Sequence, residues 1–400
     1  MNIAIFHFGF MYSGGGERHP IYEALYLEKK GHHVECFAPA IRPDQCHPGL
    51  IEKIPIKGFL PKVRVSIPLR DFASMVLSSV LCPLFAQRFK GFDVVLCHGQ
   101  PAVWIAYSTT RILGKKYVCY LHQPARFLYP RPIDVRTGWA IKRDFALLNE
   151  IVRFSRPIVA SLDHVSVVTA QRVLVNSHWI GDWVRDIYGI DPLVCPPGVD
   201  IHSFTPVNKK GDVNLSRVRI QKPFVLSTNR HYPQKGMEYL IQLMPKVLSE
   251  LDVTFVLTGD YTKYTKSLMH LATDLGVRDH IIFTNHLKEG ELIRLYQNAD
   301  VYLYTSPHED FGLGPIEAMA CGTPPVVWDY AGPAENVRHG VTGMKAQPYS
   351  VDDMAEKVLL LLTDKKLRSK IAGNGRDFVV NNFSWERHVD TLDSVLCAIH

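Results

Sequence analysis

Short apolar runs recur along the chain and alternate with longer segments in which apolar and polar residues follow a helical period. The runs are rich in β-branched and aromatic residues and carry few charges, which is typical of parallel strands buried on both faces. We predict such strands at residues 2–8, 34–37, 92–97, 117–121, 172–175, 224–228, 253–258, 301–304 and 324–328. Strands that alternate with helices in this way predict an α/β fold with parallel sheets.

The chain length and one linker-like stretch predict two domains. Four hundred residues exceed a typical single core. Residues 195–200 read CPPGVD, a composition that is typical of a domain linker. We therefore place one Rossmann-like domain at 1–196 and a second at 197–382. A final helix at 383–400 is expected to pack back on the first domain.

Composition and charge exclude several classes of protein. Hydrophobic residues make up 46% of the chain and charged residues 21%, as in globular proteins. The net charge of +6 suits an anionic ligand or an anionic membrane surface, and it is weaker than the basic stripes of nucleic-acid binders. The eight cysteines include no Cys-x-x-Cys pair, which predicts buried reduced thiols and no structural zinc site. Since residues 1–6 enter a strand directly, we expect no signal peptide and a cytoplasmic location.

Residues 309–322 read EDFGLGPIEAMACG and separate two of the predicted strands. Pro315 favours the first position of a helix, and Gly322 favours a helix end. Glycines at 312 and 314 let backbone N–H groups approach a ligand closely, and a helix N-terminus attracts anions. The pattern predicts a loop followed by a short helix that begins at Pro315.

Two carboxylates bracket this loop. Glu309 precedes the predicted helix, and Glu317 falls in its predicted first turn. Carboxylates accept hydrogen bonds from hydroxyl groups, so two that face one pocket suit a polyol ligand such as a sugar nucleotide. The alternative is that both are ordinary favourable charges near a helix N-terminus.

A glycine-rich loop follows the first predicted strand. Gly14, Gly15 and Gly16 precede a helix that we predict from about Arg18 to Lys30. A strand, a glycine loop and a helix open many nucleotide-binding folds. The loop matches neither the Gly-x-Gly-x-x-Gly fingerprint nor a P-loop. A tight turn without a ligand is the alternative.

His122 and Arg126 follow the strand predicted at 117–121. Ligands of open parallel sheets bind beyond the carboxyl ends of the strands. A histidine at that place can donate or accept a hydrogen bond in a ligand site. The alternative is a loop histidine that only ends the strand.

Arg230 and Lys235 lie on the loop after the strand predicted at 224–228. Two such cations can neutralise a leaving diphosphate without a metal. A charge pair about 4 Å apart contributes about 4 kcal/mol at an effective dielectric constant near 20. That energy corresponds to roughly a thousandfold in rate if it acts only in the transition state. The alternative is a pair of solvated surface cations.

Residues 57–92 combine basic residues with an apolar run at 72–86. The run is shorter than the roughly 20 residues that span a bilayer. It predicts either a core helix that covers one face of the sheet or a basic and apolar surface that contacts anionic lipid. The second reading adds peripheral contact with the cytoplasmic face of a membrane.

The motif at 309–322 resembles the signature of the family-4 retaining glycosyltransferases, because two glutamates separated by seven residues enclose Phe-Gly-Leu and precede Ala-Met-Ala-Cys-Gly-Thr-Pro. The spacing of Arg230, Lys235 and the following glycine matches the same family. The resemblance implies the GT-B fold, with two Rossmann-like domains whose parallel sheets face each other across a cleft. The layout of the first half also resembles mannosyltransferases of lipid-linked oligosaccharide and O-antigen assembly.

This resemblance implies roles for individual residues. Glu309 is expected to bind hydroxyls of the donor sugar, and Glu317 the ribose. His122 is expected near the reacting carbon of the sugar. The implied catalytic residues are His122, Arg230, Lys235 and Glu309. The implied donor-binding residues are Gly15, Gly16, Arg230, Lys235, Leu287, Glu309, Phe311, Gly312, Leu313 and Glu317, and the acceptor-binding residues are Gly14 and Arg126.

The expected function is retaining transfer of a hexose, mannose from GDP-mannose, to a glycan or lipid-linked acceptor. No Asp-x-Asp pair stands at a strand end, so we expect no metal and no cofactor besides the nucleotide-sugar donor. Nucleic acid is not an expected partner. The alternatives are a UDP-hexose transferase, a nucleotide-sugar epimerase of the same fold and a non-catalytic sugar-nucleotide binder.

Overall fold

The computed structural model describes residues 1–59, 78–137, 146–215 and 218–400, and these residues form two compact units. Unit 1 comprises Met1–Pro130, Gly138–Pro197 and Trp385–His400. Unit 2 comprises Arg131–Thr137 and Gly198–Ser384. The short segment at 131–137 lies inside the range predicted for the first domain, but it folds with unit 2.

Unit 1 contains a seven-stranded parallel sheet in the order β3-β2-β1-β4-β5-β6-β7. Its register places Ile3 beside Val94 and His7 beside His98. The strands are β1 (Asn2–His7), β2 (His33–Ala38), β3 (Ile56–Gly58), β4 (Val94–His98), β5 (Lys116–Leu121), β6 (Arg172–Val175) and β7 (Leu193–Val194).

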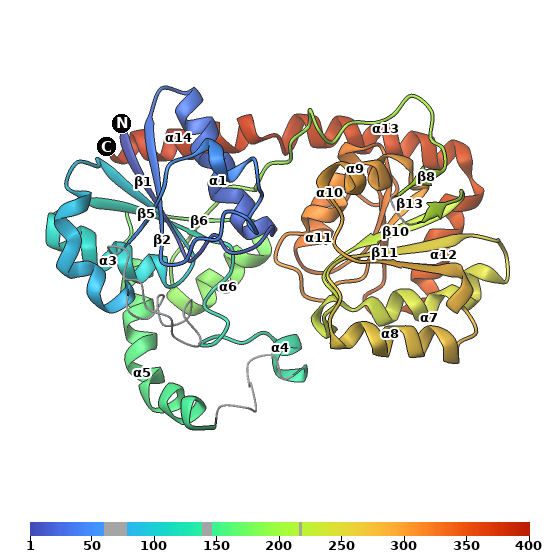
Figure 1. Cartoon of the computed structure of the whole chain (residues 1–400), viewed down its shortest axis with the longest axis horizontal. Coiled ribbons are helices and arrows are strands. Elements are labelled where there is room, and N and C mark those ends of the chain that lie inside the picture. Colours follow the sequence, from blue (N-terminus) through green and yellow to red (C-terminus); the bar gives the residue numbers. More distant parts are fainter. Residues whose placement is uncertain (60–77, 138–145, 216–217) are drawn as a thin grey trace. The chain divides into compact units, whose positions relative to one another are not determined.

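Helices cover both faces of this sheet (Figure 1). On one face, residues of α1 and α14 pack on Ile3 and Ile5 of β1. On the other face, residues of α3, α6 and η2 pack on Ala4 and Phe6. The helices of unit 1 are α1 (Gly15–Lys29), η1 (Ile51–Lys53), η2 (Cys82–Phe89), α3 (Ala102–Leu113), α5 (Ala146–Val168), α6 (His178–Tyr188) and α14 (Trp385–Ile399). Alternate residues of each strand therefore enter two separate cores, which is why the strands are apolar throughout.

Unit 2 repeats this architecture with a six-stranded parallel sheet in the order β12-β11-β10-β13-β14-β15. The strands are β10 (Phe224–Thr228), β11 (Thr254–Thr258), β12 (Ile281–Thr284), β13 (Val301–Tyr304), β14 (Pro325–Trp328) and β15 (Met344–Ala346), with a separate antiparallel pair, β8 (Val213–Asn214) and β9 (Arg219–Ile220). The helices are α4 (Pro132–Arg136), η3 (Pro233–Lys235), α7 (Met237–Leu248), α8 (Lys263–Asp274), η4 (Arg278–His280), α9 (Glu289–Asn298), α10 (Leu313–Ala320), α11 (Ala331–Asn336), α12 (Val351–Thr363) and α13 (Lys365–Asn382). Helices α7, α8 and α12 pack on one face, and α9, α10 and α13 on the other.

Each sheet contains a point at which the strand order reverses. In unit 1 the reversal lies between β1 and β4, and in unit 2 between β10 and β13. Ligands of doubly wound sheets bind just beyond the carboxyl ends of the strands at such points. The prediction of two Rossmann-like α/β domains is confirmed, and the two reversal points show where in each unit to look for a site.

The predicted strands are present, but β12, the pair β8–β9 and three very short outer strands were not predicted. β3 and β7 are the outer strands of the first sheet, and β15 is an outer strand of the second. Each has only two or three residues. An outer strand is paired on one side only, so it needs no long apolar run that a sequence pattern would reveal.

Two predicted helix starts were wrong. Helix α1 begins at Gly15 rather than near Arg18. Helix α10 begins at Leu313, so Pro315 is its third residue and Glu317 lies beyond its first turn. In both places glycines enter the helix, although isolated glycines are poor helix formers and favour a loop in a prediction from sequence.

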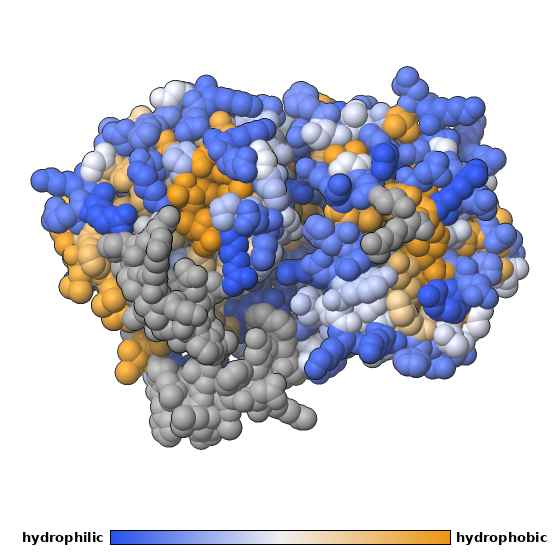
Figure 2. Space-filling view, viewed as in Figure 1, coloured by the Kyte–Doolittle hydropathy of each residue, from blue (hydrophilic) through white to orange (hydrophobic). Residues whose placement is uncertain are grey.

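Part of the segment predicted to contact lipid, residues 60–77, lies outside the described residues. In its described part, Val80 and Leu84 are 67% and 78% exposed. Figure 2 shows apolar surface at the outer edge of unit 1, on the side where Figure 1 places α3. Among the helices of the described ranges, none is both long enough and apolar enough to span a bilayer.

Candidate active site

Two loops meet at the reversal point of unit 2. One connects β10 to α7 and carries Arg230 and Lys235, and the other connects β13 to α10 and carries Glu309. Because β10 and β13 are adjacent and parallel, both loops leave the same edge of the sheet. Their meeting places Lys235 Nζ 2.5 Å from Glu309 Oε2. Residues 74 positions apart in the chain thus form one ion pair.

Glu309 is held as a carboxylate. Burial alone would raise its pKa, but the charge and hydrogen bond of Lys235, with a smaller contribution from Arg131, lower the pKa to about 2. Ser306 Oγ donates a second hydrogen bond to the same Oε2 atom, at 3.0 Å. The side chain remains 21% exposed. A fixed anion that is partly open to solvent can accept hydrogen bonds from the hydroxyls of a ligand.

Arg131 supports this loop and was not predicted from the sequence. Its Nη1 donates to the His308 carbonyl at 2.6 Å and to Asp310 Oδ1 at 2.9 Å. Its Nε donates to Asp134 Oδ2 at 3.2 Å. Burial would lower the pKa of Arg131, but Asp310 and Asp134 raise it. The guanidinium thus holds the residues on both sides of Glu309, and no local pattern could reveal contacts across 177 to 179 residues.

Glu317 is oriented by a group of hydroxyls that the sequence did not indicate. Tyr296 OH donates to Glu317 Oε2 at 2.9 Å. Thr228 Oγ1 lies 2.8 Å from that tyrosine oxygen and 2.7 Å from Tyr302 OH. These contacts join β10, α9 and β13 to the carboxylate on α10.

Gly314 is required by this network. A Cβ at this position would overlap the hydroxyl of Tyr302 and lie 3.0 Å from its Cζ. Gly312, which caps α10, adopts φ = 86°, a left-handed conformation that favours glycine. The glycines were predicted to expose N–H groups, and the structure supplies a separate packing reason for Gly314.

Phe311 contributes its ring to the core. The ring is buried and packs edge-on against Phe383, with centroids 6.0 Å apart. The Phe311 carbonyl accepts a hydrogen bond from Asn336 Nδ2 at 2.6 Å. Leu287 and Leu313 are half-buried against the same core. The ring of Phe311 therefore belongs to the core, and only the backbone of this expected donor-binding residue lies in the loop.

Arg230 differs from Lys235 in its surroundings. Its side chain is exposed, and its guanidinium carbon lies 6.0 Å from the centroid of the Tyr232 ring. Lys235 is three-quarters buried beside Glu309. The predicted pair of cations is therefore present on one loop, with one member paired to a carboxylate and the other at the surface.

In unit 1, His122 lies just after β5 and beside His98 at the end of β4. His122 Nε2 is 3.4 Å from His98 Nδ1, and Asn176 Nδ2 donates to the His122 carbonyl at 3.1 Å. Burial and the neighbouring His19 and His98 lower the pKa of His122. The imidazole is therefore neutral near pH 7 and can donate from one ring nitrogen and accept at the other. Asn176 thus holds the loop that carries His122.

The three glycines of the predicted glycine-rich loop lie at the N-terminus of α1. Gly14 is the N-cap, and Gly15 and Gly16 form part of the first turn. The Gly14 carbonyl accepts a hydrogen bond from His47 Nε2 at 2.9 Å. A Cβ at Gly14 would meet the Glu17 carboxylate at 2.6 Å, whereas one at Gly16 would meet nothing within 4 Å. Arg126 is half-buried on the loop after β5.

We predict that the substitution Glu309→Gln destabilises unit 2 mainly at neutral pH. The lowered pKa means that ionised Glu309 stabilises the fold above pH 4.5, and that this stability is lost as the pH falls from about 4.5 towards 2. The expected difference from wild type is on the order of 1–3 kcal/mol at pH 7. Urea unfolding from pH 7 to pH 3, with Glu250→Gln as an exposed control, measures it. A difference that does not change with pH would contradict the assignment.

A second substitution tests the hydroxyl network. Gly314→Ala places a methyl group on Tyr302 OH and is expected to destabilise unit 2 by about 1–3 kcal/mol. Adding Tyr302→Phe removes the hydroxyl and should restore part of this loss in a double-mutant cycle. Gly373→Ala, in α13 with open space around it, is the control and should be neutral or slightly stabilising. Additive effects of the two substitutions would disprove the contact.

Two family models match the chain. "Glycosyltransferase Family 4" matches residues 13–203, and "Glycosyl transferases group 1" matches residues 215–378. Solved structures of similar fold include HepE of Anabaena in complex with UDP and glucose, with a TM-score of 0.75 at 20% identity over 99% of both chains. The sucrose-phosphate synthase of Thermosynechococcus elongatus has a TM-score of 0.77 at 18% identity over 100% of this chain and 98% of that one. At these identities the likeness shows the fold.

Related sequences agree with the family models. An uncharacterised glycosyltransferase of Methanocaldococcus jannaschii is 35% identical over 301 residues, which cover 74% of this chain and 72% of that protein. A GDP-mannose-dependent α-(1-6)-phosphatidylinositol monomannoside mannosyltransferase of Mycobacterium tuberculosis is 30% identical over 199 residues, 48% of this chain and 52% of that protein. The Glu309–Glu317 motif, the two reversal points and these matches lead to one conclusion: the chain belongs to the family-4 glycosyltransferases and is a transferase with the GT-B fold.

Proposed function

We propose that this glycosyltransferase moves a hexose, mannose from GDP-mannose, to a glycan or lipid-linked acceptor with retention of configuration. We further propose that the protein's own cations, rather than a divalent metal, neutralise the leaving diphosphate. The observation that carries the proposal is the Lys235–Glu309 pair at the reversal point of unit 2. The pair combines a carboxylate that can accept hydrogen bonds from sugar hydroxyls with a cation that can bind phosphate. It lies at the place where Rossmann-like sheets bind nucleotides.

Both members of the pair keep groups that can bind a donor. An ammonium has three N–H donors, of which Glu309 uses one, so two remain for phosphate oxygens. Two donors to Glu309 converge on Oε2, and a carboxylate accepts up to about four hydrogen bonds. Arg230 lies exposed on the same loop as Lys235 and can add a second cation. The ion pair fixes the position of Lys235 before a ligand binds, which lowers the cost of ordering its long side chain.

Glu317 suits the ribose of the donor. Tyr296 fixes one of its oxygens, and a carboxylate held in this way can accept hydrogen bonds from a diol. The same group of hydroxyls is tied to Thr228 at the end of β10. Unit 2 therefore offers one carboxylate for the sugar and a second for the nucleotide.

Transfer requires the bond between the anomeric carbon and the diphosphate oxygen to break. The electron pair stays on the departing oxygen, and positive charge develops on the sugar. Fixed cations aimed at the developing negative charge stabilise the transition state more than the ground state. In the proposed reaction Arg230 and Lys235 have this role, and His122, whose imidazole is neutral, hydrogen-bonds the sugar near the reacting carbon. The acceptor hydroxyl attacks on the face that the diphosphate leaves, and its proton passes to the departing diphosphate oxygen.

The choice of mannose rests on a relative. The M. tuberculosis protein is named as GDP-mannose-dependent, and its match spans about half of each chain. A UDP-hexose is the second candidate, because the similar structure of HepE holds UDP and glucose. Contact of unit 1 with an anionic membrane is a further part of the proposal, supported by the exposed Val80 and Leu84.

A donor panel tests the proposal. We expect GDP release from GDP-mannose, with transfer to an acceptor, to exceed nucleotide release from UDP- and ADP-hexoses by at least about tenfold. Turnover should not depend on added Mg²⁺ or Mn²⁺. A preference for a UDP-hexose would select the second candidate. Conversion of the donor into an isomerised sugar without transfer would show an epimerase, and a strict requirement for Mg²⁺ would disprove the role of the cations.

Arg230→Ala separates catalysis from stability, because this side chain is exposed. We expect kcat to fall by about 100- to 1,000-fold, since the cation acts on charge that develops in the transition state. The melting temperature should not change. Arg294→Ala, an exposed arginine on α9, is the matched control and should retain full activity. Unchanged kcat in Arg230→Ala would remove Arg230 from the mechanism.

A further inference from the structure

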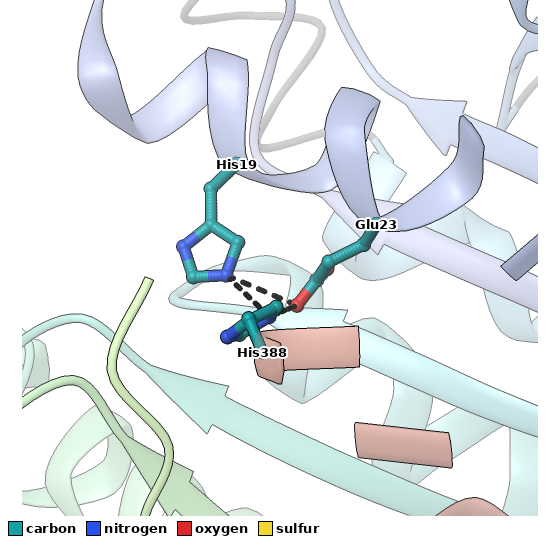
Figure 3. Close-up of side chains that lie close together, drawn as sticks. All are labelled: His19, Glu23 and His388. Carbon is teal, nitrogen blue, oxygen red and sulfur yellow. Dashed lines mark hydrogen bonds and ion pairs between the residues drawn. The ribbon is translucent and has the colours of Figure 1, made fainter. Parts of the chain in front are cut away.

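Three buried side chains converge between two helices of unit 1, and the ring of one of them, His19, lies 4.8 Å from that of His122, centroid to centroid. His19 and Glu23 lie four residues apart on α1, and His388 lies on α14. Figure 3 shows the two imidazoles and the carboxylate pointing towards one another. Their relative exposures are 2%, 0% and 3%. A buried carboxylate is costly unless a cation or hydrogen bonds compensate its charge.

Three ligand atoms form a nearly equilateral triangle. His19 Nε2 lies 3.1 Å from His388 Nε2 and 3.1 Å from Glu23 Oε1, and His388 Nε2 lies 3.0 Å from the same oxygen. Each ring nitrogen has one lone pair or one hydrogen in the plane of the ring, so it cannot bond well to both neighbours. Ligands about 2.1 Å from a tetrahedral zinc ion lie roughly 3.4 Å apart, slightly more than these separations. The triangle resembles a metal-ligand set more than a chain of hydrogen bonds.

Contacts outside the triangle orient the His388 ring so that its Nε2 atom faces the other two ligand atoms. His388 Nδ1 lies 2.8 Å from the carbonyl oxygen of Pro196, and Cys195 Sγ is 3.4 Å from the same nitrogen. A carbonyl oxygen only accepts, so Nδ1 carries a hydrogen and Nε2 is the atom that faces the triangle. Histidine ligands of metals typically donate their other N–H to a carbonyl in this way.

Glu23 has an outer contact too. Its second oxygen, Oε2, lies 2.7 Å from Nε2 of the buried His98. Glu23 Oε1 is thereby left to the triangle, while Oε2 faces β4.

We propose that His19, Glu23 and His388 bind one divalent transition-metal ion, Zn²⁺ by the chemistry of the ligands, and that this ion joins α14 to α1. Imidazole nitrogen suits Zn²⁺ and its neighbours in the first transition row, whereas Mg²⁺ and Ca²⁺ prefer ligand sets made of oxygen. Two histidines and one glutamate form a known protein set for zinc. The positive ion compensates the charge of Glu23 in the core of unit 1.

The proposed ion has a structural role. Trp385, at the start of α14, stacks on Tyr22 of α1 with ring centroids 4.8 Å apart. The ion would add a second tie between the same two helices, at the next turn of α14. Since α14 is separated from α1 by most of the chain, a bond that joins them stabilises unit 1 by closing a long loop.

Metal analysis of the untagged full-length chain tests the proposal. We expect about one zinc ion per chain in purified protein. After removal with a chelator, added Zn²⁺ should raise the melting temperature by roughly 5 °C. Added Co²⁺ should give visible absorption bands that saturate at one ion per chain. Wild-type protein that holds no stoichiometric metal after purification, and binds neither Zn²⁺ nor Co²⁺ on addition, would overturn the proposal and leave a hydrogen-bonded ion pair.

Variants locate the ion. His388→Gln and Glu23→Gln should each lose the Co²⁺ bands and the thermal shift, whereas His33→Gln, an exposed histidine of unit 1, should retain both. Equal binding by wild type and His388→Gln would overturn the assignment. If the variants do not fold, as circular dichroism would show, the Co²⁺ titration of the wild-type chain still decides. These measurements do not depend on the sugar donor, so their outcome is independent of the proposed function.

Discussion

The ion pair between Lys235 and Glu309 is the constraint on which the geometry of unit 2 depends. A carboxylate in this position loses much of its hydration, and the lysine compensates that loss. The pair also connects loops that leave two neighbouring strands, so neither loop can move without breaking it. Arg131 holds the second loop in place, because it binds the His308 carbonyl and the Asp310 carboxylate on either side of Glu309. The site is built on rigid strand ends through a few charged contacts.

Much of this arrangement was predictable because it follows from local rules. The apolar runs identified the strands, and parallel strands bring their carboxyl ends to one edge. Lys235 and Glu309 could therefore each be placed after a strand from the sequence, whereas the pairing of β10 with β13 that brings them together could not. Arg131, Tyr296 and Tyr302 could not, since each acts through a partner that only the folded chain brings close. A charge or a hydroxyl in an unremarkable segment carries no signal of such a contact.

The two units use the same topology for different chemistry. At the reversal point of unit 2 the side chains are charged, with a lysine beside a glutamate. At that of unit 1 they are histidines, since His7 and His98 are adjacent on β1 and β4. The cysteine pattern argued against a zinc site, but it carries no information on the proposed ligands His19, Glu23 and His388. His388 comes 365 residues after Glu23, so a pattern search along the chain could not group them.

Neither unit is a continuous stretch of chain. The segment 131–137 belongs to unit 2, although its neighbours on both sides belong to unit 1, and the last sixteen residues complete unit 1 after unit 2 has been synthesised. A ribosome makes the chain from its N-terminus, so the core that α14 covers stays open until residues 385–400 have been made. Cleaving the gene at the interdomain linker would leave one fragment without its closing helix and the other without Arg131. Each half of the chain thus depends on residues that the other half supplies.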